Sequence, residues 1–115
     1  MAYNVVFSAD AEKDFDLIFD FLIESYEHFG EAPDAAIDRA EEQLHHIMQS
    51  AMALSQAPFV GTLHDHIAPG LRHVTREKAI FWFDVVESNN LVRILAVFYG
   101  GQDHHRHMLI RLMGP

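Results

Sequence analysis

The sequence contains no cysteine, little positive charge and no long apolar run. Without cysteine the chain has no disulfide, no thiolate zinc site and no cysteine nucleophile. Eight Lys and Arg residues stand against seventeen Asp and Glu, a net charge of −9. This balance argues against tight, sequence-blind nucleic-acid binding, which depends on cations that neutralise phosphates. No apolar run approaches the ~20 residues that cross a bilayer, so we expect no membrane contact.

The chain is also poor in the residues of linkers, with four prolines and six glycines among 115 residues. Half of the residues are apolar, 11% are aromatic and 22% are charged, which is typical of a compact globular protein. This length suits one hydrophobic core, so we expect a single domain over residues 1–115. The first residues lack the basic start and apolar stretch of a signal peptide, so we expect a cytoplasmic protein.

Charge is distributed unevenly along the chain. Residues 1–42 hold twelve acids against two bases, whereas residues 43–115 hold five acids against six bases. Eight of the nine histidines lie in this second part, which mild acid would make cationic. A nucleic acid, if one binds, is therefore expected to meet the C-terminal part of the chain.

The N-terminal part predicts a strand followed by two helices. Residues 3–7 are aromatic and β-branched, and Ser8 is placed as the N-cap of a helix that ends near Gly30. A second helix is expected from Pro33 towards Pro58. The apolar positions recur every three or four residues, as Ala11, Phe15, Ile18, Leu22, Tyr26 and Phe29, then Ile37, Ala40, Leu44, Ile47, Ala51 and Leu54. The short connector predicts an antiparallel hairpin with both stripes facing inward.

The periodicity changes from helix to sheet after Gly70. Residues 71–75 alternate modestly, and 79–86 and 91–99 are apolar runs separated by turn residues, so we expect a three-stranded antiparallel meander. Its middle strand is apolar on both faces, which predicts cover by helices on one side and by a partner or the terminal segment on the other. Residues 103–113 predict a short C-terminal helix. The fold class is therefore α+β, with the N-terminal strand completing the sheet.

Five segments in this order carry a resemblance to a known family. They are residues 8–14, 54–61, 70–72, 80–86 and 92–97, followed by a polar cluster. Together they resemble the RelE/ParE toxins of bacterial toxin–antitoxin pairs over nearly the whole chain. The resemblance is to the ParE-like branch more than to the ribosome-dependent nucleases.

The resemblance implies a small type II toxin held inactive by a cognate antitoxin that wraps its surface. One branch of this superfamily poisons DNA gyrase and is associated with plasmid stabilization, and the other cleaves messenger RNA on the ribosome. Similarity to the ParE-like branch favours a gyrase inhibitor that acts by binding a protein, without catalytic residues or a cofactor.

Two alternatives remain open. A ribosome-dependent endoribonuclease would use Arg72, Arg93 and Tyr99 with a terminal histidine, His105 or His107. Nuclease relatives carry basic residues just past the last strand, where residues 99–103 here read Tyr-Gly-Gly-Gln-Asp. Because of that departure, the second alternative is that the chain has a toxin-like fold that has lost its toxicity.

Cationic and apolar residues of the sheet and tail are the expected partner contacts. They are Arg72, Arg76, Lys78, Arg93, Tyr99, Arg106 and Met108. Arg72 and Arg93 are expected to approach one another on neighbouring strands. The favoured reading for these two is a structural role, through pairing with Asp84, Glu87 or the acidic helices.

Three histidines of the tail, His104, His105 and His107, could bind a metal or act as acid and base. On a helix, positions 104 and 107 share a face while 104 and 105 diverge, so at most two of the three would ligate well. A solvated tail is the favoured reading.

A second pair, His64 and His66, lies in the polar stretch after Gly61. Two ligands are too few for a metal site unless this loop approaches the histidines of the tail. The favoured reading is a solvated loop, and the sequence predicts no metal site.

Overall fold

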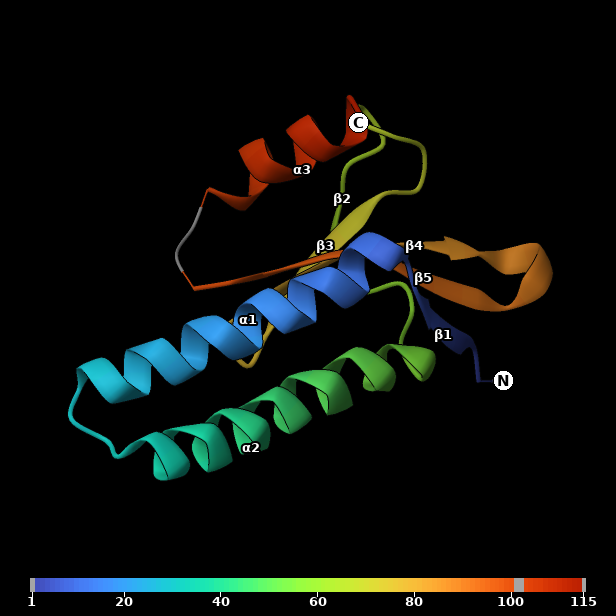
Figure 1. The fold of residues 1–115 in the computed structure, drawn as a ribbon. Helices are drawn as coiled ribbons and strands as arrows, with labels where there is room; N and C mark the ends of the chain where they lie inside the picture. Colours follow the sequence, from blue (N-terminus) through green and yellow to red (C-terminus); the bar gives the residue numbers. More distant parts are fainter. Residues whose placement is uncertain (1, 101–102, 115) are drawn as a thin grey trace.

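The computed structural model describes residues 2–100 and 103–114. Its elements are β1 (Asn4–Phe7), α1 (Ala9–His28), α2 (Pro33–Met52), β2 (Thr62–Leu63), β3 (Arg72–Arg76), β4 (Ala79–Val86), β5 (Leu91–Tyr99) and α3 (His104–Leu112). They form one five-stranded sheet in the order β1-β5-β4-β3-β2 (Figure 1). β1 runs parallel to β5, and the other neighbours are antiparallel. The predicted α+β class is confirmed.

The first two helices begin where the sequence predicts. The hydroxyl of Ser8 accepts a hydrogen bond from the Ala11 N–H, so it caps α1, and Pro33 occupies the first turn of α2. The two helices form the expected hairpin. The assignment of Phe29 to the inward stripe is wrong. Helix α1 ends at His28, and the Phe29 side chain, in the turn beyond it, is 85% exposed.

The meander is confirmed, and β2 adds a strand that the polar stretch after Gly61 did not predict. Its two residues pair with His73 and Arg72, too short a run to show alternation. Gly61 makes this pairing feasible, because a Cβ there would lie 2.1 Å from the carbonyl oxygen of His73.

The helical hairpin covers one face of the sheet and forms the larger core (Figure 1). Phe81 and Phe83 of β4 are fully buried beneath it, together with Ile94 of β5. We call the side of the sheet that the helical hairpin covers the hairpin face. Residues paired across neighbouring strands share a face, so the strand register assigns the remaining residues to this face or to the opposite one.

Helix α3 covers the opposite face (Figure 1), which we call the α3 face. A smaller core lies here, made by Leu71, Ile80, Trp82, Ala96, Phe98 and Met108. The terminal segment therefore provides the second cover that the central strand was predicted to need. Met108 is 1% exposed, so its assignment as a partner contact is wrong: it is the residue that packs α3 on the sheet.

None of the helices in the described ranges is long and apolar enough to span a membrane.

Candidate functional site

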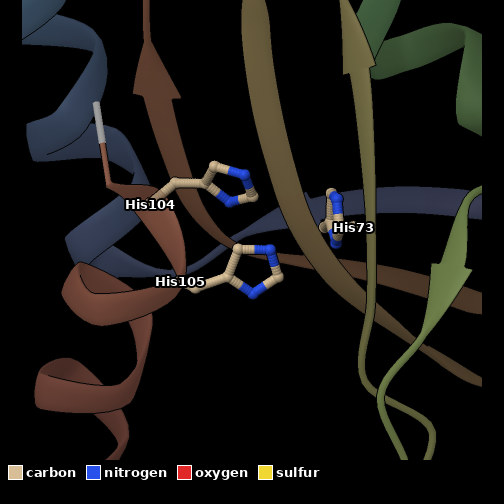
Figure 2. Close-up of side chains that lie close together, drawn as sticks. All are labelled: His73, His104 and His105. Carbon is tan, nitrogen blue, oxygen red and sulfur yellow. The ribbon is translucent and has the colours of Figure 1, made fainter. Parts of the chain in front are cut away.

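The first turn of α3 places two histidines over the sheet. The carboxylate of Asp103 accepts a hydrogen bond from the Arg106 N–H at 3.4 Å and so caps the helix. Met108, one turn further on, holds the helix against the α3 face. His104 and His105 are thereby directed towards strand β3 (Figure 2).

Four imidazoles meet at this point, and we call His64, His73, His104 and His105 the histidine cluster. One ring nitrogen from each of His73, His104 and His105 lies within 4.8 Å of the others. Figure 2 shows the two α3 side chains reaching towards His73 on β3. His64, just beyond β2, places Nε2 2.6 Å from Nδ1 of His73. Segments from three parts of the chain therefore contribute to one group of donors.

Trp82, the one tryptophan of the chain, adjoins the cluster. Its indole Nε1–H donates to Nδ1 of His104 at 3.1 Å. Its ring centroid lies 4.9 Å from those of His64 and His73 and 5.4 Å from that of His105. The indole therefore contacts every member of the cluster.

Burial and the neighbouring imidazoles favour the uncharged form of His64, His73 and His104. Burial, with the nearby His104 and His64, lowers the pKa of His73 to about 4. Burial is also the main cause that lowers the pKa of His64 and of His104, followed for both by His105. Neutral imidazoles offer a lone pair, so these side chains are in the form that binds metal ions or accepts protons.

The histidine cluster differs from the sequence-based expectation that the tail and the loop after Gly61 are solvated. His64 is 6% exposed, so the solvated-loop reading of this residue is wrong: the loop does approach the tail. His104 and His105 both contact His73, because both stand in the first turn of α3. The ring of His107 lies instead against Phe98. His73 was missed, since a lone histidine in a short strand gives no local signal.

A second polar contact joins α1 to α3 at the edge of β5. β1 pairs with residues 91–94, so among the described residues no strand flanks β5 on this side beyond Ile94. The carboxylate of Asp14, 4% exposed, accepts from the Val97 N–H at 2.9 Å and from both terminal nitrogens of Arg111 at 2.7 and 3.0 Å. The Leu95 carbonyl accepts from Arg111 and from the Ser8 hydroxyl.

Sequence reasoning missed this contact, although a signal was available. Asp14 stands three residues after Ala11 and four before Ile18, which places its carboxylate on the buried stripe of α1. A buried carboxylate requires a hydrogen-bonding partner. Arg111, on the last turn of α3, is that partner, and the pair ties together the elements on opposite sides of the sheet.

Among the described residues, a smaller and a larger cleft adjoin β5. One, of about 280 Å³, is lined by Asp14, Leu17, Phe21, His107 and Arg111 among others. A larger one, of about 490 Å³, lies between the hairpin and the β3–β4 turn, lined by Lys78, Tyr99 and Gln43 among others. Gln43 Nε2 donates to the Tyr99 hydroxyl at 3.4 Å. Two predicted partner contacts, Lys78 and Tyr99, thus share the larger cleft.

The expected approach of Arg72 to Arg93 is wrong, because β4 separates β3 from β5. The two side chains also belong to opposite faces. Arg72 pairs with Phe83 of the hairpin core, whereas Arg93 follows Val92 of that core and so lies on the α3 face. Arg93 forms two hydrogen bonds with Asp84, at 2.8 and 2.6 Å, which is one of the structural pairings anticipated for it.

The remaining predicted contacts are on the surface. Arg76 is exposed at the end of β3, and its guanidinium donates to the Thr75 carbonyl at 3.0 Å. Arg106 is exposed on α3. Gly101 and Gln102, part of the segment that departs from the nuclease pattern, lie outside the described residues.

Solved structures of toxin–antitoxin systems share this architecture. A chain of the chromosomal ParDE system from P. aeruginosa superposes with a TM-score of 0.66 at 19% identity, covering 87% of this chain and 98% of that one. The mutant RelE toxin from E. coli in its free state gives 0.61 at 9% identity, covering 98% and 99%. The toxin–antitoxin complex RelBE2 from Mycobacterium tuberculosis gives 0.59 at 19%, covering 86% and 99%. The chain has the RelE/ParE fold.

Sequence comparison adds nothing to this identification: no family model and no curated protein matches the chain. Within the RelE/ParE fold, the residues of the nuclease alternative are divided between the faces of the sheet. Arg72 and Tyr99 belong to the hairpin face, and Arg93, His105 and His107 to the α3 face. The two histidines are also apart from each other, since His105 joins the histidine cluster and His107 lies against Phe98 and lines the 280 Å³ cleft.

Proposed function

We propose that this protein is the toxin of a type II toxin–antitoxin pair, and that it inhibits DNA gyrase by binding rather than by cleaving RNA. The RelE/ParE fold, shared with a chain of a ParDE system, supports the first part. The division of the five nuclease candidates between two faces of the sheet carries the second. RNA cleavage requires a base, an acid and cations around one phosphate, and these side chains do not converge on one pocket.

The outer side of α3 is the surface that we assign to the antitoxin. Three large apolar side chains of α3 are exposed, Leu109, Ile110 and Leu112, and a fourth, Met113, follows at the end of the helix. Exposed apolar residues gathered on so short a helix are characteristic of a surface that a partner covers. Arg106 on the same helix adds a cation.

A neighbouring part of α1 extends this surface. Leu17 and Phe21 are exposed and line the 280 Å³ cleft with Arg111 of α3. An amphipathic segment of an antitoxin would place apolar side chains in such a cleft. The interaction surface therefore spans α1 and α3 across the free edge of β5.

Two assays with the purified chain test the target. Supercoiling of relaxed plasmid by gyrase is measured beside cleavage of messenger RNA on translating ribosomes. We expect loss of supercoiling without RNA cleavage. Cleavage without loss of supercoiling would instead establish the endoribonuclease alternative, and inactivity in both assays would favour a fold that has lost toxicity.

A pair of substitutions tests the antitoxin surface. Ile110→Glu places a charge on the outer side of α3, and Leu63→Glu makes the same change on β2 at the far edge of the sheet. Co-expression of the cognate antitoxin should fail to rescue growth with Ile110→Glu and should rescue it with Leu63→Glu. Equal rescue of both would contradict this assignment.

A further inference from the structure

We propose that the histidine cluster is a binding site for one divalent transition-metal ion of the Zn²⁺ class, with His73, His104 and His105 as its ligands. Neutral imidazole nitrogen is a donor suited to zinc, copper, nickel and cobalt rather than to magnesium or calcium. Three protein ligands leave one tetrahedral position for water or a partner's side chain. This site is independent of the toxin function proposed above.

The donors require only a small adjustment to reach a metal. The three ring nitrogens lie within 4.8 Å of one another, whereas nitrogens bound to tetrahedral zinc are about 3.4 Å apart. His105 is exposed on the first turn of α3, so its side chain can change rotamer without moving the strand. The fold itself supplies the convergence, because β3 ends at Arg76 and α3 begins only at His104.

His64 supplies the hydrogen bond that orients His73. When Nδ1 of His73 carries the proton, it donates to Nε2 of His64, at 2.6 Å, and leaves its own Nε2 with a lone pair for the metal. Ligand histidines in metal sites are commonly fixed in this manner by a second polar group. His64 is buried, which holds this contact in place.

The nearby carboxylates are engaged elsewhere, so imidazoles define the chemistry of the site. Asp65 accepts from the Gly70 N–H at 2.8 Å, and Asp103 caps α3. A donor set made of imidazoles favours borderline transition metals over the hard cations that require several oxygens.

Trp82 makes metal binding observable. A neutral imidazole has one N–H and one lone pair, so ligation through either nitrogen of His104 removes the acceptor that the indole uses. Loading must therefore break the hydrogen bond between Trp82 and His104. Because Trp82 is the one tryptophan and contacts all four rings, changes at this site should alter its fluorescence.

A bound ion would also fix the beginning of α3. In the described residues, the Arg111–Asp14 pair holds the last turn of this helix and Met108 holds its middle. An ion shared by His73 and the two α3 histidines would anchor the first turn to β3. We therefore expect metal to slow amide exchange in α3 and to raise the thermal midpoint.

The test uses the full chain without an affinity tag, titrated with Co²⁺ and then with Zn²⁺. Co²⁺ should quench Trp82 fluorescence and saturate at one equivalent, and Zn²⁺ should displace it and reverse the quenching. Exchange of α3 amides should slow when Zn²⁺ is bound. A response that does not saturate, or that requires several equivalents, would overturn the proposal.

Matched variants on one helix locate the ligands. His105→Ala and His107→Ala remove exposed imidazoles two positions apart, so neither should unfold the chain. We expect His105→Ala to weaken Co²⁺ binding at least about 100-fold and His107→Ala to leave it unchanged. His64→Ala should weaken binding about 10-fold, the usual effect of losing an orienting partner. Equal binding by the His105 and His107 variants would refute the site.

Discussion

The two faces of the sheet are covered in different ways. The hairpin face is sealed by two helices of twenty residues each and holds a continuous apolar core. The α3 face is covered by one nine-residue helix, with a smaller apolar core next to four imidazoles. Burial alone accounts for the first arrangement. The second places four imidazoles beside an apolar core, so the α3 face is where we locate metal binding, and the outer side of α3 with the adjoining part of α1 is where we locate the antitoxin.

Loss of an aromatic ring from the hairpin face should have the largest effect on stability. Phe81 is fully buried at the centre of β4. Phe81→Ala removes its contacts and leaves a cavity, so we expect the free energy of unfolding to fall by about 3–5 kcal/mol. Chemical denaturation measures the change. A loss of stability no larger than that caused by Met108→Ala on the α3 face would contradict the contrast between the two faces.

The contact that joins the faces should come next. Asp14→Ala leaves the Val97 N–H without its acceptor and Arg111 without its ion pair, so we expect a loss of about 3 kcal/mol. Arg111→Met should cost a similar amount, because it leaves the buried carboxylate of Asp14 with the Val97 N–H but without a counter-charge. A double-mutant cycle measures the coupling, and purely additive losses would show that the pair does not act as a unit.

The anchor of α3 should have a smaller and more local effect. Met108→Ala removes the main apolar contact between α3 and the sheet, so we expect a loss of about 2 kcal/mol. Amide exchange should accelerate in α3 and remain slow in α1 and α2. Equal acceleration in all three helices would mean that the faces unfold together.

The smallest effect is expected at the exposed ion pair of the α3 face. Asp84→Asn weakens the contact with Arg93, but half of the arginine side chain is solvated, so we expect a loss of at most about 1 kcal/mol. Added salt should change the stability of the native chain more than that of this variant. A loss as large as that of Asp14→Ala would contradict the distinction between exposed and buried pairs.

The elements could be predicted because their signals are local. The Ser8 cap, the stripes of the two long helices and the apolar runs of β4 and β5 each occupy one segment, and the structure confirms them. β2 was missed because its two residues owe their strand pairing to β3 rather than to their own pattern.

The candidate site could not be predicted to the same degree, because it depends on which distant segments meet. His73 gains its partners through the position of α3, which no spacing within β3 encodes. Arg72 and Arg93 are the opposite case, because they were predicted to meet and the structure keeps them apart. Strand order and side-chain alternation, neither of which the spacing of the two arginines shows, place them on different faces.

One measurement tests the proposed function most directly in cells. The chain is expressed alone for a short period, and incorporation of labelled thymidine and labelled methionine is followed over the first minutes. We predict that DNA synthesis stops before protein synthesis and that the cells become filamentous. Loss of protein synthesis first, or growth with neither process affected, would contradict a gyrase-binding toxin.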